Sequence, residues 1–428
     1  MYSTTKNLTI LAIQWVSLVL FVSLSQYANA QWSEFRGPQG SGITSGSSFP
    51  VNITTDDIEW NIDIHGKGWS SPVVVGNQVW LTTATEDGKQ MSVICVALDS
   101  GKVLLDRVLH ENETPDFCHP TNSYASPTPV VEEGHAYIHF GKYGTTCLDT
   151  KTFETVWQRL DLECDHFRGP GSSPILFEDL MIVAFDGADR QYVVALDKRS
   201  GKTVWTRDRD IKYGTDNGDF KKAYGTGSIV NVNDQPLLIY PAAVATNAYQ
   251  PKTGDPVWTL YHGGMNVSSR PLMTPEGNVL ISNGMGKLFA VDPSGKGDIT
   301  ESNIRWQSGK AISRKPSPLV IDDRFYMLND KGILSCCRTK DGQSIWQQRI
   351  GNAYSSSPVF DGESIFVCSE NGIVYAFAHS DKFKQLGKSK LAEGFKATPA
   401  IAGPRMVFRS FSKLFCVKAT SRQSTTDQ

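Results

Sequence analysis

The 428-residue sequence has few of the features that mark membrane-embedded, helical or nucleic-acid-binding proteins. After the first 30 residues no apolar run is long enough to span a bilayer, and no long segment repeats apolar residues every 3.6 positions. The formal net charge is −2 and there is no basic stripe, so we expect no nucleic-acid partner. No low-complexity tract or charged linker divides the chain, which favours one large domain.

Motifs of the common enzyme classes are also missing. The sequence contains no Gly-x-Ser-x-Gly, no His-Glu-x-x-His and no phosphate-binding loop, and its histidines show no nucleophile–base pattern. The turn from Asp186 to Asp189 supplies too few oxygen ligands for calcium. We therefore predict no metal site and expect no cofactor.

What the chain does contain is a phrase that recurs along its length. The fullest copy runs from Gly171 to Trp205 and reads Gly-Ser-Ser-Pro, two apolar strands, then Ala-Leu-Asp-x-x-Ser-Gly-Lys-x-x-Trp. Pro318, Pro358 and Pro399 mark copies 40 and 41 residues apart, the length of a four-stranded propeller blade. The marker or its degenerate form occurs at Ser71-Pro72, Ser126-Pro127, Ser173-Pro174, Gly227-Ser228, Arg270-Pro271, Ser317-Pro318, Ser357-Pro358 and Thr398-Pro399.

The ends of the repeat predict how the ring closes. The last copy has only three strand signals, ending near residue 418, and an orphan fourth-strand signal at 58–62 precedes the first copy. Pairing the two removes an exposed sheet edge. We predict an all-β, eight-bladed propeller of four-stranded antiparallel blades, completed by this N-terminal strand. Seven blades is the alternative, because the fourth copy is degenerate. A tryptophan is expected to wedge between blades at Trp157, Trp205, Trp258, Trp306 and Trp346.

The phrase Ala-Leu-Asp-x-x-(Ser/Thr)-Gly-Lys-x-x-Trp resembles the repeat of the pyrroloquinoline-quinone-like (PQQ-like) propellers. That group includes quinoprotein alcohol dehydrogenases and the propeller lipoprotein of the outer-membrane assembly machinery. The opening at 32–42, Trp-Ser-Glu-Phe-Arg-Gly-Pro-Gln-Gly-Ser-Gly, is similar to a secreted branch of the group. The resemblance covers about residues 32–419 and implies the propeller fold, which hosts unrelated functions.

The chain is expected to have four segments. A single charge at Lys6, an apolar run and the cleavage-like Ala28-Asn29-Ala30 predict a signal peptide over 1–30, with a retained membrane anchor as the alternative. Residues 31–57 form a non-repeat arm, of which 40–57 is expected to wrap the outside of the propeller. The propeller spans 58–419 and a disordered tail 420–428. We predict an exported, periplasmic or extracellular monomer without a membrane span after signal removal.

Loops that enter the innermost strands of a propeller gather on one face, around the central channel. Here they are rich in aromatic and cationic residues, which suits an anionic or planar ligand or a sugar stacked on rings. The competing interpretation is that the aromatics cap the channel and the charges are solvated. The candidate ligand-binding residues are Trp69, His119, Asn122, Tyr124, Arg168, Lys222, Tyr224, Arg270, Lys315, Tyr354 and Lys396.

Two cysteines lie in loops of neighbouring blades on this face, Cys118 and Cys164. Three interpretations stay open. The residues are unpaired, or an oxidising compartment joins them in a disulfide, or they bind zinc with His119 and His166, whose spacing matches no standard zinc motif.

Three functions are compatible with the sequence. The favoured one is a non-catalytic binding or scaffold module for a protein, a glycan or a small anionic or planar ligand at the loop face. The resemblance implies an alternative, an alcohol or sugar dehydrogenase dependent on PQQ and Ca²⁺, with Trp69, Arg168 and Asp186 as candidate cofactor contacts. The third is a hydrolase or lyase that uses a cluster of His119, Asn122, Tyr124, Arg168 and Lys222.

Overall fold

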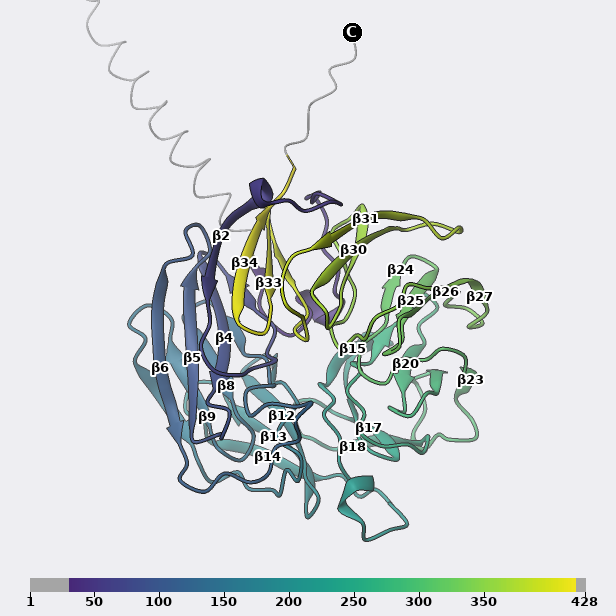
Figure 1. The fold of residues 1–428 in the computed structure, drawn as a ribbon. Helices are drawn as coiled ribbons and strands as arrows, with labels where there is room; N and C mark the ends of the chain where they lie inside the picture. The colour runs from purple at the N-terminus through teal and green to yellow at the C-terminus, as the bar shows by residue number, and fades with distance from the viewer. Residues whose placement is uncertain (1–30, 421–428) are drawn as a thin grey trace, which may run out of the picture.

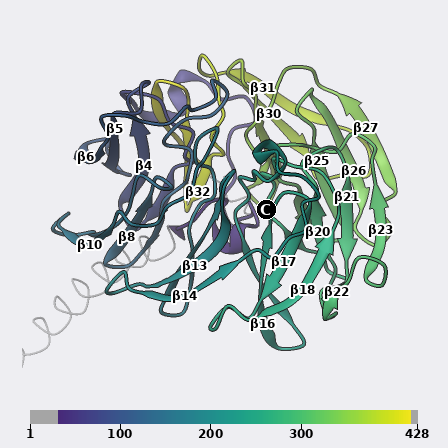
Figure 2. The same cartoon turned by 90° about the horizontal axis from the view of Figure 1, so that it is seen from below.

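The computed structural model describes residues 31–420, and within them eight β-sheets follow one another around a central channel (Figures 1 and 2). The prediction of an all-β, eight-bladed propeller is confirmed. The seven-blade alternative is wrong, because the degenerate fourth copy still forms four strands between residues 228 and 261. The predicted signal peptide, and the tail from residue 421, lie outside the described residues.

Short β-branched and aromatic stretches separated by tight turns form each blade. The second and third strands of a blade pair in continuous register, as from Leu180↔Asp197 to Asp186↔Gln191 in the third blade. The third and fourth strands pair with a register shift, which lies between Ala195 and Leu196 in the same blade. From the channel outward, the strands of blades one to four are β3 (Val73–Val75), β4 (Gln78–Ala84), β5 (Gln90–Ala97) and β6 (Val103–Glu111); β7 (Val130–Glu132), β8 (His135–His139), β9 (Thr145–Asp149) and β10 (Thr155–Arg159); β11 (Ile175–Phe177), β12 (Leu180–Asp186), β13 (Gln191–Asp197) and β14 (Thr203–Asp208); β15 (Ser228–Val232), β16 (Gln235–Pro241), β17 (Ala245–Tyr249) and β18 (Pro256–Tyr261).

The second half of the ring repeats this arrangement, with one extra strand, β22 (Gly297–Asp298), parallel to β18. The strands of blades five to eight are β19 (Leu272–Met273), β20 (Val279–Ser282), β21 (Leu288–Val291) and β23 (Ile304–Ser308); β24 (Leu319–Ile321), β25 (Arg324–Leu328), β26 (Ile333–Arg338) and β27 (Ser344–Arg349); β28 (Val359–Phe360), β29 (Ser364–Cys368), β30 (Ile373–Ala378) and β31 (Gln385–Lys390); β32 (Ala400–Ala402), β33 (Arg405–Arg409), β34 (Lys413–Lys418) and β2 (Ile58–Asp63).

The ring closes through the N-terminal strand, as predicted. Strand β2 pairs antiparallel with β34, from Ile58↔Val417 to Asp63↔Lys413. The last blade therefore contains strands from both ends of the repeat region, which Figure 1 shows side by side. This pairing covers an edge of β34 that would otherwise be open to another chain.

The recurrent tryptophans join neighbouring blades. Trp60 of β2 donates its indole N–H to the backbone oxygen of Leu98 in the first blade at 2.8 Å, and the ring packs over Gly101. A side chain in place of Gly101 would collide with this ring, which explains the glycine of the repeat phrase. The same donation to the next blade, at 2.7–3.1 Å, is made by Trp157, Trp205, Trp258, Trp306 and Trp346. The predicted wedging is confirmed.

The first residues of the arm lie inside the channel. Strand β1 (Gln31–Trp32) pairs with the inner strand β3, with Trp32 opposite Val74. The buried Arg36 donates to the backbone oxygens of Ser317 (3.2 Å) and Pro318 (2.8 Å) at the inner edge of blade six. The short helix η1 (Pro38–Gly40) follows. The arm thus ties together blades on opposite sides of the channel.

The sequence predicted that the segment 40–57 wraps the outside of the propeller, but the structure shows a different path. Ile43 bridges Phe360 on the inner strand β28, and the Ile53 amide donates to the Ser389 hydroxyl on the outer strand β31. The segment therefore crosses blade seven from channel to rim before η2 (Thr55–Asp57) leads into β2. Inner-strand edges offer unpaired backbone groups, and the arm pairs with those of blades one, two and seven.

Candidate functional site

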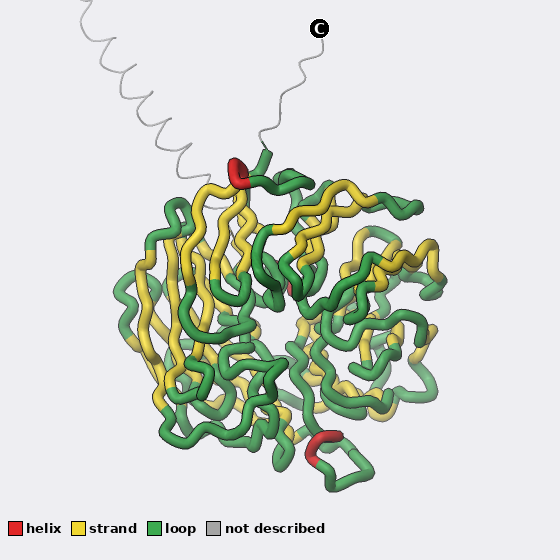
Figure 3. The backbone as a smooth tube through the Cα atoms, in the orientation of Figure 1, coloured by secondary structure: helices red, strands yellow, loops and turns green. Residues whose placement is uncertain are grey.

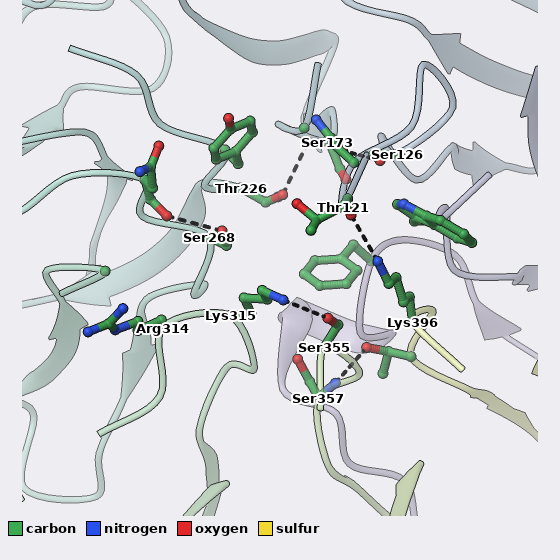
Figure 4. A pocket seen from close by; sticks show the side chains of 18 of the residues that line it. Thr121, Ser126, Ser173, Thr226, Ser268, Arg314, Lys315, Ser355, Ser357 and Lys396 are labelled. Carbon is green, nitrogen blue, oxygen red and sulfur yellow. Dashed lines mark hydrogen bonds between the residues drawn. The ribbon is translucent and has the colours of Figure 1, made fainter. Parts of the chain in front are cut away.

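A cavity of about 430 Å³ opens at the face where loops enter the inner strands (Figure 4). All eight blades contribute to its wall, and Phe35 of the channel-bound arm lines it as well. Because the arm lies across the channel, the cavity is a funnel that ends at the arm.

Beneath the funnel, a belt of hydrogen bonds joins the blades at the start of their inner strands. In each link, the backbone N–H of one blade donates to a Ser or Thr hydroxyl of the next. The links are Ser71 to Thr128, Thr128 to Ser173 and Ser173 to Thr226, then Arg270 to Ser317, Ser317 to Ser357, Ser357 to Thr398 and Thr398 to Ser71, all at 2.9–3.1 Å.

This hydroxyl belt corrects two repeat markers taken from the sequence. The second blade contains two Ser/Thr-Pro pairs in succession, and the belt residue is Thr128 rather than Ser126. In the fourth blade it is Thr226 rather than Ser228. Arg270 has no hydroxyl, so it interrupts the belt between blades four and five. Its side chain instead holds the arm, through Glu34 (2.8 Å) and the Phe35 carbonyl (2.6 Å).

Counting from the belt identifies the residues that face the funnel. An extended chain places alternate side chains on the same side. The residue two positions before the belt residue lines the funnel in every blade, and these eight residues are Trp69, Ser126, Gly171, Tyr224, Ser268, Lys315, Ser355 and Lys396.

Lysines surround one indole on the wall formed by blades one and eight. The Lys396 ammonium lies 4.8 Å and the Lys67 ammonium 5.6 Å from the centre of the Trp69 ring. Lys396 also donates to the backbone oxygen of Thr121 at 3.0 Å, a contact visible in Figure 4. Cations bind favourably over an indole face, so Trp69 organises both lysines.

The positive charge of this wall exceeds the nearby negative charge. Lys315 lies 3.7 Å from Glu370 and 3.4 Å from the Ser355 hydroxyl, and Arg314 is exposed beside it. Burial lowers the pKa of Lys396, and repulsion from Lys315 and Lys67 lowers it further, against the attraction of Glu370. The neighbouring lysines disfavour the positive charge on Lys396 because like charges repel. An anion placed among the three lysines would relieve this repulsion and would therefore be stabilised.

Seven of the eleven candidate residues line the funnel, namely Trp69, His119, Asn122, Arg168, Tyr224, Lys315 and Lys396. Arg168 is already paired with Asp219 at 3.1 Å. Asp219 belongs to η3 (Gly218–Phe220), on a loop that stands out from the ring in Figure 3. Asn122 donates to the backbone oxygens of Arg168 and Pro170, both at 3.0 Å, and so connects two loops.

The other four candidates are buried elsewhere. Tyr124 packs between blades and donates to the Asp116 carbonyl at 2.6 Å, and Tyr354 is fully buried between blades six and seven. Lys222 is buried with its ammonium 3.2 Å from the His166 ring, and Arg270 holds the arm. Tyr124 and Tyr354 precede their belt residues by four and three positions instead of two, which points them into the core.

The lining residues that were not predicted from the sequence are mostly small and hydroxylated. Thr121, Ser126, Ser268 and Ser355 belong to this group, together with Phe35 of the arm. The two-residue offset from the belt was the signal that could have identified three of them, Ser126, Ser268 and Ser355.

Cys118 and Cys164 are both free thiols in this structure. They pack into different inter-blade clusters, Cys118 beside Gly169 and Cys164 beside the His166 ring at 3.6 Å. Within residues 31–420, no group of three or more His, Cys, Asp or Glu side chains is placed to hold a metal ion.

The residues do not fit the PQQ and Ca²⁺ alternative. Asp186 is fully buried and makes a two-point ion pair with the buried Arg209, at 2.9 and 2.7 Å, so its carboxylate does not reach the channel. Asp330 is the carboxylate among the lining residues of the funnel, and it accepts from the backbone amides of Arg314 and Lys315. Arg168, the third proposed contact, is occupied by Asp219.

The cluster proposed for a hydrolase or lyase does not converge. Tyr124 and Lys222 lie in the protein interior, while His119 and Asn122 line the funnel. The side-chain partner of His119 is Thr121, at 2.8 Å, and within residues 31–420 no carboxylate orients its ring. An imidazole held in this way lacks the orienting group of a catalytic base.

Comparison with known proteins gives a consistent match. A family model described as outer membrane protein assembly factor BamB matches residues 50–220 and 188–385. The BamB of Moranella endobia is 26% identical over 262 residues, 58% of this chain and 60% of the relative. That of Yersinia pestis is 27% identical over 212 residues, 46% of this chain and 50% of the relative. The chain thus spans about half to three fifths of these curated relatives.

Solved structures with the same fold include a BamB and an enzyme. BamB from Moraxella catarrhalis superposes with a TM-score of 0.61 at 14% identity, over 84% of this chain and 99% of the other. Quinohemoprotein alcohol dehydrogenase from Comamonas testosteroni gives 0.67 at 12% identity, over 95% of this chain and 83% of the other. At these identities the likeness concerns the fold. No helix among the described residues has the length and apolar character needed to cross a membrane.

Proposed function

Because the chain belongs to the family of outer membrane protein assembly factor BamB, we propose that it is an exported, non-catalytic scaffold that binds an acidic segment of a partner protein in its funnel. Relatives that carry this family name are assembly factors, which favours a protein partner over a substrate to be converted. The observation that supports the funnel as the binding site is the trio of Lys67, Lys315 and Lys396 around Trp69.

The geometry suits a carboxylate on an extended or flexible segment. Two ammonium groups are held near one indole and a third is held by Ser355, so their positions are fixed before a ligand arrives. Fixed donors lose less conformational entropy on binding than free surface lysines do. The hydroxyl groups at the funnel wall can accept or donate further hydrogen bonds to a peptide backbone.

The test is a titration of the mature chain, from Gln31, with a fluorescently labelled hexaglutamate peptide at low and at physiological salt. We expect saturable binding that weakens as salt rises, since the contacts are partly exposed charge pairs. Lys315→Gln with Lys396→Gln should weaken binding at least about tenfold, the effect of two charge-assisted contacts of roughly 0.7 kcal/mol each. Lys202→Gln, an exposed lysine in a turn of blade three, is the matched control.

Three outcomes would overturn the proposal. The first is equal affinity of the double variant and the control, and the second is tighter binding of an acidic polysaccharide than of the peptide. The third is Ca²⁺-dependent quenching of tryptophan fluorescence by pyrroloquinoline quinone, which would return the dehydrogenase alternative to consideration.

A further inference from the structure

A second cleft, of about 650 Å³, lies at the opposite end of the inner strands, between blades four, five and six. Strand β15 begins beside Thr226 of the belt and ends at the turn Asn233-Asp234, which borders the cleft. The cleft is therefore separated from the funnel by the length of an inner strand. The partly exposed side chains of Ile229, Met273 and Val320 line it.

One edge of β15 has no partner strand in the part of the chain that the structure describes. The hairpin to β16 has a two-residue turn in which Asn233 and Asp234 both have positive φ, at 50° and 60°. In such a hairpin the pair next to the turn, Val232↔Gln235, exchanges backbone hydrogen bonds. Along the strand, hydrogen-bonded pairs then alternate with pairs that exchange no hydrogen bonds, so Asn231↔Pro236 and Ile229↔Leu238 are of the second kind. The N–H and C=O groups of Asn231 and Ile229 therefore point away from β16. Pro236 stands opposite Asn231, where no amide donor is needed.

The arm shows what such an edge accepts. At the equivalent inner-strand position of blade one, Val74 pairs with Trp32 of β1. In blade two the Val131 amide donates to the Ser33 carbonyl at 2.8 Å. In blade seven Phe360 exchanges hydrogen bonds with Gly42 and Thr44. The chain itself thus adds extended backbone to the inner edges of three blades.

The arm contacts β15 of blade four through η1, but among the described residues it adds no strand to that edge. Its residues Gln39 and Ser41 border the cleft, whereas no hydrogen bond among the described residues reaches the backbone of Asn231 or Ile229. Both positions lie on the cleft wall, and Asn231 is exposed. Open sheet edges are sites of strand addition.

The cleft has a definite chemical character. Its aliphatic wall is bordered by two exposed carboxylates, Asp234 and Asp322, at the turns of blades four and six. The Thr274 hydroxyl on the same wall is buried without a hydrogen-bond partner. Apolar side chains flanked by negative charge are complementary to an extended segment with alternating apolar residues and a lysine or arginine at its ends.

We propose that this cleft binds an extended, basic-ended segment of a partner protein by adding it as a strand to the free edge of β15. The backbone groups of Ile229 and Asn231 would pair with the segment, and its alternate apolar side chains would pack on Met273 and Val320. This site is independent of the funnel, which has the opposite charge preference.

The probe is a labelled nine-residue peptide of alternating valine and threonine with a lysine at each end, added to the mature chain. Saturable binding is expected. N-methylation of the peptide amides on one edge should weaken it at least about tenfold, since the peptide then loses its amide hydrogen bonds to β15. Asp234→Asn with Asp322→Asn should weaken it about threefold or more and reduce its salt dependence.

A protein variant tests the same edge. Asn231→Pro removes the free amide without disturbing a bond to β16, and should abolish binding. Leu176→Pro is the matched control, because Leu176 holds the equivalent position in blade three, away from the cleft. The funnel variant Lys315→Gln with Lys396→Gln should bind the peptide as the unmodified chain does.

The proposal is overturned by absence of binding at several hundred micromolar peptide, or by equal affinity for the N-methylated and unmodified peptides. It is also overturned if Asn231→Pro abolishes a concentration-dependent dimer seen by sedimentation, since a second copy of the chain would then occupy the edge. The peptide methylation remains informative if Asn231→Pro fails to fold.

Discussion

The backbone amide of Thr398 in the last blade donates a 3.1 Å hydrogen bond to the hydroxyl of Ser71 in the first blade, 327 residues earlier. Ser71 also donates its own amide to Thr128, so one residue closes the belt and begins its next link. All three residues are buried. A ring of blades has no free end, and this contact, with the β2–β34 pairing, is where the chain meets itself.

Ser71→Ala should destabilise the protein by about 1–3 kcal/mol, because it leaves the buried Thr398 amide without an acceptor. The measurement is urea unfolding followed by tryptophan fluorescence. Ser268→Ala is the control, since Ser268 lines the funnel and bonds locally to the Asn266 carbonyl, outside the belt. Equal unfolding midpoints for the two variants would show that the belt contributes nothing particular.

Trp60→Phe should loosen the closure of the ring. The substitution removes the indole N–H that binds the Leu98 carbonyl and leaves most of the apolar ring in place, at a cost of about 1–2 kcal/mol. Hydrogen exchange measured by mass spectrometry should accelerate in β2 and β34. Trp346→Phe, which removes the equivalent bond to Ser380, should accelerate exchange in blades six and seven instead. Identical exchange patterns would contradict this local role.

Arg36→Leu should release the arm from the channel. The guanidinium is fully buried and donates to four backbone oxygens, of Gly40, Ser41, Ser317 and Pro318, so the variant should lose roughly 3 kcal/mol or more. Limited proteolysis should then cleave within residues 31–57. Arg199→Leu, at an exposed turn, is the control and should remain uncut. An intact arm in Arg36→Leu would show that β1 and Arg270 suffice to hold it.

The free energy of unfolding should decrease as the pH is lowered below about 6.5. Burial lowers the pKa of His110 and His262 to about 4 and that of His139 to about 3, whereas in the unfolded chain a histidine titrates near 6.5. The unfolded state therefore binds protons that the native state refuses, and the stability present above pH 6.5 is lost progressively toward pH 4, by up to about 1.4 kcal/mol per pH unit for each histidine.

The measurement is the urea midpoint at pH 7.5 and at pH 5.0. His139→Gln should show a smaller difference between the two pH values than the unmodified chain. His65→Gln, at an exposed histidine, is the control. The same pH dependence in both variants would place its origin in other groups.

The repeat phrase allowed blades, their number and the closing strand to be predicted, because these features depend on local order. Alternating apolar residues, hairpin turns and a tryptophan at fixed spacing act within about 40 residues. Whether a given loop side chain faces the funnel or the core between blades was harder to predict. Trp69 and Tyr224 line the funnel, yet Tyr124 and Tyr354, at nearly the same distance from a Ser-Pro marker, are buried between blades.

The sequence by itself determined the strand pattern and the blade repeat, since each rests on interactions between residues close along the chain. Tertiary structure alone decided which residues form the belt, because Thr128 and Ser126 are chemically alike and differ only in whether they meet Ser71 and Ser173. It also decided that the arm enters the channel. Arg36 finds its acceptors about 280 residues away, and no local pattern encodes a contact that exists only once the ring has formed.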